Sequence, residues 1–155
     1  MNNMDKAATK LENNEPLNVL HYVRLKHDSK ERRKKILADN GTYLSKKFLK
    51  GHPNVKLMER PFIDCEYSTR NMMDRNEYVN MCGRLQVGDI DMVILDDIDE
   101  LASSFADCIS ANDYLKEFGI VVYDISTEKM YSNLENQMLE HTIYMMIRSK
   151  NYKFS

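Results

Sequence analysis

The chain has 155 residues, of which 43% are hydrophobic, and its formal net charge is -2. This length suits one domain with its own core and is too short for two independent domains of ordinary size. The sequence holds neither the roughly 20 apolar residues of a membrane span nor the core of a signal peptide, so we expect a soluble, cytoplasmic protein without membrane contact.

Positive and negative charges are concentrated in different parts of the chain. Residues 24–60 hold 12 Lys or Arg against 4 Asp or Glu, whereas residues 89–117 hold 1 against 9. A basic segment can offer a surface to phosphates, or it can face the acidic segment within the fold or across a dimer. The three cysteines, Cys65, Cys82 and Cys108, lack CxxC spacing and lie among apolar residues. We expect buried free thiols, as in a reducing cytoplasm.

The first half of the chain predicts an arm, a strand and a long helix. Residues 1–16 are polar and lack an apolar period, so we expect a flexible N-terminal arm outside the core. Leu17–Leu25 is rich in branched and aromatic residues and predicts a strand buried on both faces. A helix is predicted over residues 30–50, with Ile36 and Tyr43 facing the core.

Strands and helices alternate through the rest of the chain. The pattern predicts strands over residues 55–64, 90–95, 120–125 and 129–131, and helices over residues 75–86 and 105–118. A final helix, Asn133–Ser149, has a broad apolar face that can pack on its own domain or on a second subunit. Together these elements predict one α/β domain over residues 17–150, with helices flanking a central, mostly parallel sheet of four to five strands.

Three stretches resemble motifs of the serine recombinase (resolvase/invertase) catalytic domain. Tyr22–Lys26 is similar to the opening strand motif Y-x-R-V-S. Asp64–Arg75 resembles the block D-x-x-x-S-G-x-x-x-x-R, with Asp64, Ser68 and Arg75 matching and Thr69 in the place of the glycine. Gly88–Asp91, followed by an apolar strand, resembles G-x-(I/V)-D and is the best match. The resemblance implies a three-layer resolvase-like fold with a long C-terminal helix.

The same resemblance implies a degenerate active site. Lys26 stands where the family has its nucleophilic serine, and Glu100 and Ser103 replace the two arginines of the motif L-D-R-L-x-R. The family's serine attacks a DNA phosphodiester while an arginine cluster stabilises the transition state without metal. We expect Lys26 to abolish the covalent step and the negative charge of Glu100 to repel the phosphate.

The remaining positions of the vestigial site still suggest DNA association. Arg24, Lys26 and Arg75 can hold a phosphate without cleaving it, which predicts non-specific binding to the DNA backbone. No cofactor and no metal is expected for this role. The helix Asn133–Ser149 predicts a homodimer, or a heterodimer with a related recombinase. We expect no separate DNA-binding domain, because the sequence ends at Ser155.

Two alternatives remain open at this point. The first is an active site-specific recombinase or nicking enzyme that uses Ser29 or Ser68 as a displaced nucleophile, although a helix cap and a turn explain these serines equally well. The second is a magnesium-binding α/β domain that uses the acidic loop Asp96–Glu100 at the carboxyl edge of the sheet.

Overall fold

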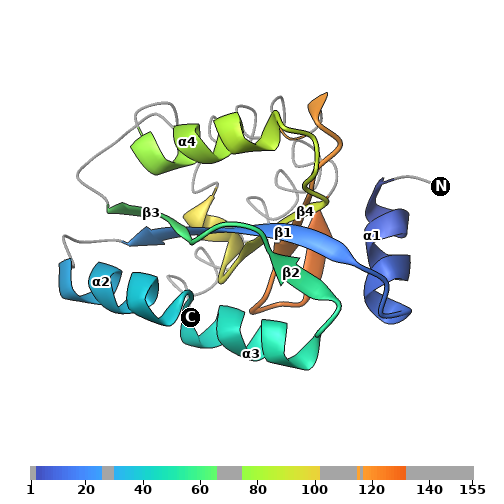
Figure 1. The fold of residues 1–155 in the computed structure, drawn as a ribbon, viewed down its shortest axis with the longest axis horizontal. Helices are drawn as coiled ribbons and strands as arrows, with labels where there is room; N and C mark the ends of the chain where they lie inside the picture. Colours follow the sequence, from blue (N-terminus) through green and yellow to red (C-terminus); the bar gives the residue numbers. More distant parts are fainter. Residues whose placement is uncertain (1–2, 26–29, 66–74, 102–114, 116, 132–155) are drawn as a thin grey trace, which may run out of the picture.

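The computed structural model describes residues 3–25, 30–65, 75–101, 115 and 117–131. In these residues a mostly parallel sheet is flanked by helices on both faces, which confirms the predicted α/β class (Figure 1). The helices are α1 (Asn3–Glu12), α2 (Lys30–Asp39), α3 (Tyr43–Gly51), α4 (Asn76–Leu85) and the short 3-10 helix η2 (Ile98–Glu100). The strands are β1 (Leu17–Leu25), β2 (Val55–Leu57), β3 (Phe62–Cys65), β4 (Met92–Leu95), β5 (Val121–Asp124) and β6 (Lys129–Tyr131).

The sheet has the order β2-β1-β4-β5-β6, and β3 also pairs with β1. β2 is parallel to the first part of β1 and β3 to its second part, where Arg24 lies opposite Asp64. β4 and β5 continue the parallel sheet, and β6 closes it as an antiparallel strand. The carboxyl ends of β1, β3, β4 and β5 therefore lie along one edge.

Side chains of β1 alternate between two cores, one on each face of the sheet. Leu20 and Tyr22 belong to the core under α4. Val19 packs in the core that includes Ala7 of α1 and Phe48 of α3, and Val23 packs near Ile36 of α2. Burial of both faces accounts for the nearly continuous apolar run of this strand.

The helix predicted over residues 30–50 is in fact two helices. Asn40 adopts a φ of 57°, and Thr42 begins α3 with a capping box that it shares with Ser45. A Cβ atom at Gly41 would lie 2.5 Å from the Ser45 hydroxyl, so glycine suits the junction. The predicted inward position of Tyr43 is wrong, because this residue starts the second helix and is 78% exposed.

Two further segments differ from the sequence prediction. The strand predicted over residues 55–64 is divided into β2 and β3, and Pro61, which lacks a ladder donor, lies just before β3. Residues 1–16 contain helix α1 instead of an arm outside the core. Ala7 is buried and Leu11, one turn later, packs against the same cluster, so the short apolar face of this helix contributes to the core.

The other predicted elements are borne out where the structure describes them. The predicted helix 75–86 matches α4, and the predicted strands 90–95, 120–125 and 129–131 match β4, β5 and β6. Cys65 and Cys82 are free thiols as expected, but only Cys82 is buried, whereas Cys65 is half-buried. The predicted helix Asn133–Ser149 and nearly all of 105–118, with Cys108, lie outside the described residues. Among the helices that are described, none has the length and apolar character needed to cross a membrane.

Candidate functional site

Charged and polar side chains gather where the parallel strands end. Arg24 is the penultimate residue of β1, Asp64 lies opposite it on β3, Asp96 follows β4, and Asp124 ends β5. Ligands of open α/β sheets commonly bind at the carboxyl edge of the strands. This edge is therefore the candidate site, and its chemistry depends on what each of these groups contacts.

Asp64 is the centre of a hydrogen-bond network that connects the sheet to α4. Its carboxylate accepts hydrogen bonds from the Tyr22 hydroxyl at 2.8 Å and from the backbone N–H groups of Glu77 and Tyr78, both at 2.9 Å. Arg75, the N-cap residue of α4, makes no side-chain cap of its own. Asp64 thus satisfies helix N–H groups that would otherwise be available to a bound anion.

Arg75 connects the start of α4 to the loop after β4. Its side chain is buried, and its Nη1 donates to the carbonyl oxygens of Leu101 at 3.0 Å and Glu100 at 3.4 Å. Burial and the charge of Asp64 raise the pKa of Tyr22, and the nearby Arg75 guanidinium opposes that rise. Arg75 therefore lies within the fold, between Tyr22 and the loop carbonyls.

Arg24 lies on the same face of the sheet as Arg75. It is two residues from Tyr22 on β1, so both side chains project toward the α4 side. The structure thus groups Arg24, Asp64 and Arg75 around Tyr22. The other sequence-predicted site residues, Lys26, Ser29, Ser68 and Ser103, lie outside the described residues.

The environment of Glu100 differs from the one expected of a charged acid. Its Oε2 atom is enclosed and makes no hydrogen bond to any described residue. Burial, followed by the charges of Asp96 and Asp97, raises the pKa of Glu100 to about 9, while Arg32 acts in the opposite direction. Desolvation therefore favours the neutral carboxylic acid at pH 7, in contrast to the negative charge expected from the sequence.

A buried polar network on the opposite face of the sheet was not foreseen as part of the site. His21 is fully buried, and its Nε2 atom lies 3.2 Å from Oδ1 of Asp96. The Thr42 hydroxyl donates to the same oxygen at 2.8 Å. This network connects the end of β4 with the start of α3. A histidine in the middle of an apolar strand was its only sequence signal.

The acidic loop does not assemble into a magnesium site in the part of the chain described. Asp97 accepts the N–H of Asp99 at 2.8 Å, and Asp124 accepts the N–H of Ile98 at 3.1 Å. Across the described residues, no three Asp, Glu, His or Cys side chains are placed to hold a metal ion together. Asp97 of this loop and Asp124 of β5 accept N–H groups of η2, and the magnesium alternative has no ligand set among the described residues.

Comparison with known protein families identifies one that matches this chain. The sequence profile of the family described as "Resolvase, N terminal domain" matches residues 20–150. No protein of curated function matches the chain in sequence.

Solved structures share the fold at low sequence identity. A resolvase family site-specific recombinase from Streptococcus pneumoniae has a TM-score of 0.59 at 14% identity, covering 89% of this chain and 91% of that one. The N-terminal catalytic domain of TP901-1 integrase has a TM-score of 0.57 at 15% identity, with coverages of 89% and 98%. The C-terminal catalytic domain of ISC1926 TnpA, an IS607-like serine recombinase, has a TM-score of 0.53 at 14% identity, with coverages of 89% and 86%.

Proposed function

Because this chain belongs to the family of the resolvase N-terminal domain, the catalytic domain of serine recombinases, we propose that it is a recombinase domain that has lost strand cutting and acts by association. The observation that carries the proposal is Glu100, an acid with an enclosed Oε2 atom and a pKa raised to about 9, at a position where the resemblance places an arginine. A neutral carboxylic acid supplies no positive charge to a phosphorane-like transition state.

The nucleophile position supports the same conclusion. Lys26 stands where the family motif Y-x-R-V-S has its serine. A lysine amine cannot form the phosphoserine link through which a serine recombinase holds a cut strand. Without this link, the energy of the broken phosphodiester would not be conserved for rejoining, even if a phosphate were bound nearby.

The environment of Arg75 further limits catalysis. Its guanidinium donates to the backbone carbonyls of residues 100 and 101, and the residue as a whole is 2% exposed. An arginine that stabilises a transferring phosphate must present its fork to that phosphate. Arg24 is only half-buried, and we therefore assign the residual contacts with the DNA backbone to Arg24 and Lys26.

Association with protein completes the proposal. The apolar face predicted on Asn133–Ser149 suits a homodimer or a heterodimer with a related recombinase. Such a domain would contribute a subunit and backbone contacts to a recombination complex while its partner cuts. No cofactor is required for this role.

A trapping assay tests the loss of cutting. The full chain is incubated with labelled supercoiled DNA, quenched with detergent and analysed on a denaturing gel for label attached to protein. We expect no adduct. An adduct would overturn the proposal, and its loss in Ser29→Ala or Ser68→Ala would identify the nucleophile.

Variants that restore the family's catalytic residues test the same point further. Lys26→Ser returns the hydroxyl, and Lys26→Ser combined with Glu100→Arg also returns one cation. We expect Lys26→Ser alone to remain inactive, because the cationic cluster is still absent. Strong adduct formation by Lys26→Ser alone would show that the cluster is intact and would contradict the role given to Glu100.

A further inference from the structure

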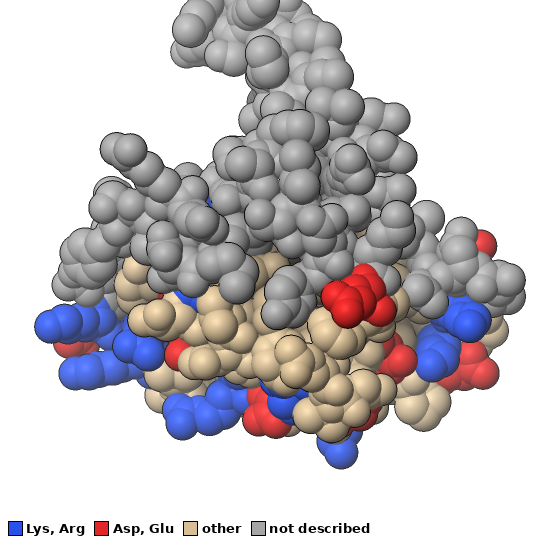
Figure 2. Space-filling view, turned by 90° about the horizontal axis from the view of Figure 1, so that it is seen from above, with Lys and Arg blue, Asp and Glu red and all other residues tan. Residues whose placement is uncertain are grey.

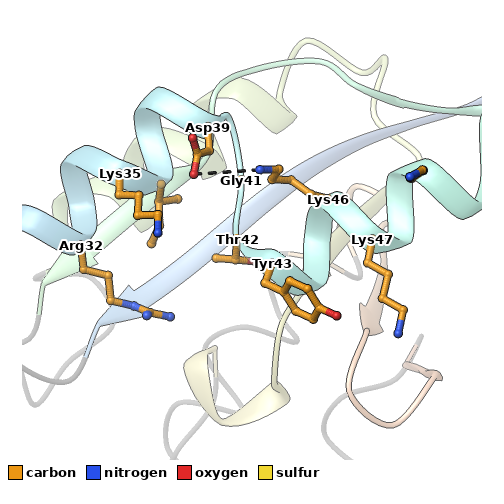
Figure 3. Close-up of a pocket in the computed structure, with 10 residues that line it drawn as sticks. Arg32, Lys35, Asp39, Gly41, Thr42, Tyr43, Lys46 and Lys47 are labelled. Atoms are coloured by element: carbon orange, nitrogen blue, oxygen red, sulfur yellow. Dashed lines mark ion pairs between the residues drawn. The ribbon is translucent and has the colours of Figure 1, made fainter.

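A second basic surface lies between α2 and α3, on the face of the sheet opposite α4 (Figure 1). The two helices border a groove of about 670 Å³. Figure 3 shows Arg32 and Lys35 projecting from α2 and Lys46 and Lys47 from α3, with Tyr43 between them. The residues that line the groove are Arg32, Lys35, Ile36, Asp39, Gly41, Thr42, Tyr43, Lys46, Lys47 and Lys50.

The groove carries an excess of positive charge. Five of its lining residues are Lys or Arg and one is an acid, Asp39, which pairs with Lys46 at 4.0 Å. Lys35, Lys47 and Lys50 are exposed to solvent. Figure 2 shows Lys and Arg side chains gathered at the end of the molecule where Figure 1 places α2. Clustered cations around a concave surface attract polyanions such as a nucleic-acid backbone.

An exposed aromatic ring accompanies these cations. Tyr43 is 78% exposed, and Val87 is the one other large hydrophobic residue in the described part of the chain that is similarly exposed. A tyrosine at a basic groove offers a flat surface on which a base can stack.

The backbone that carries Tyr43 is fixed at both sides. Thr42 precedes it as N-cap and accepts from the Ser45 N–H at 3.2 Å, while the Ser45 hydroxyl accepts from the Thr42 N–H at 2.8 Å. The Thr42 hydroxyl is also bonded to Asp96 at the end of β4. These hydrogen bonds hold the N-terminus of α3, which carries the ring, in one conformation. Less conformational entropy is therefore lost when a ligand binds.

We propose that this groove binds single-stranded nucleic acid, with backbone phosphates at Lys35, Lys47 and Lys50 and one base stacked on Tyr43. A single strand fits better than a duplex, because stacking on a side chain requires an unpaired base face. The proposal goes beyond the recombinase-derived function, since none of these residues belongs to the Arg24, Lys26 and Arg75 set.

Fluorescence anisotropy tests the stacking. The full chain is titrated against a labelled single-stranded DNA of about 12 nucleotides, which is within the usual range of single-strand site sizes, and against the corresponding duplex. We expect tighter binding of the single strand. Tyr43→Ala should weaken it by about 5-fold to about 100-fold, whereas Tyr43→Phe should bind like the parent. Val87→Ala is the matched control for removal of an exposed apolar side chain and should have no effect.

Salt dependence tests the phosphate contacts. The triple variant Lys35→Gln, Lys47→Gln, Lys50→Gln should lower the slope of log affinity against log salt by about 2, because each phosphate that the protein no longer neutralises reduces the slope by roughly 0.7. The charge-matched control replaces the exposed cations Lys56, Arg60 and Lys129 with Gln and should leave the slope unchanged.

Several results would overturn the groove proposal. These are the absence of single-strand binding, equal affinity for the duplex, an unchanged affinity in Tyr43→Ala, or an equal decrease of slope in both triple variants. None of these results depends on strand cutting. A covalent DNA adduct would refute the function proposed above while leaving the groove proposal standing.

Discussion

The two faces of the sheet place their charged residues in different environments. On the α4 face, Asp64 and Arg75 are bonded to backbone groups. At the carboxyl edge, the Oε2 atom of Glu100 is enclosed, and burial raises the pKa of this carboxyl to about 9. On the α2 and α3 face, the cations of the groove extend into solvent around Tyr43. A charged residue that is bonded within the fold stabilises the structure, whereas an exposed one remains available to a ligand.

The largest expected effect concerns the enclosed acid. The pKa of Glu100 is about 9 when folded and lies near its ordinary value of 4.5 when unfolded. The folded state therefore binds the extra proton between these values, and stability falls as pH rises through that window. One proton corresponds to about 1.4 kcal/mol per pH unit, or up to about 3 kcal/mol between pH 6 and pH 8.

Urea unfolding of the parent and of Glu100→Gln at pH 6 and pH 8 measures this effect. The amide stays neutral, so the variant should lose most of the pH dependence. Glu12→Gln, an exposed acid on α1, serves as the control and should behave like the parent. If the parent and Glu100→Gln respond equally to pH, Glu100 is not a buried neutral acid.

The next largest effect is the contribution of Asp64 to the stability of the fold. Asp64→Ala leaves the Tyr22 hydroxyl and two N–H groups of α4 without their acceptor, and should reduce the free energy of unfolding by roughly 2 to 3 kcal/mol. Chemical denaturation gives the value, with Glu12→Ala as the control. A decrease below about 0.5 kcal/mol, typical of surface substitutions, would mean that the site is open to solvent.

The smallest expected effect concerns Thr42, which connects the start of α3 to the end of β4. Thr42→Val keeps the shape of the side chain but removes the cap of α3 and the hydrogen bond to Asp96. We expect the free energy of unfolding to fall by about 1 to 2 kcal/mol in thermal or urea unfolding. Thr127→Val, at an exposed turn position, is the control. If Thr42→Val has the stability of the parent, the hydrogen bond between Thr42 at the groove and Asp96 after β4 does not stabilise the fold.

Sequence reasoning predicted the strands better than the breaks between helices. The apolar runs of β1, β4 and β5 are buried on both faces, which makes them recognisable without tertiary information. The break between α2 and α3 depends on Asn40 and on the Thr42–Ser45 capping box. The periodic pattern around these residues continues as if the helix were unbroken.

The candidate site was predicted only in part. The motifs that resemble the recombinase family identified Arg24, Arg75 and Glu100, and the structure places all three near the carboxyl edge of the sheet. The burial of these residues and the raised pKa of Glu100 could not be predicted, because desolvation depends on the surrounding fold. The His21 and Asp96 pair was missed for a related reason: its two residues lie 75 positions apart in sequence and meet across the sheet.

We propose that this recombinase domain no longer forms a covalent bond to DNA. Intact-mass spectrometry of the full chain, after incubation with supercoiled DNA and nuclease digestion, tests it most directly. We predict a single species at the mass of the unmodified protein. A second species, heavier by a residual nucleotide attached through a serine phosphodiester, would contradict the claim.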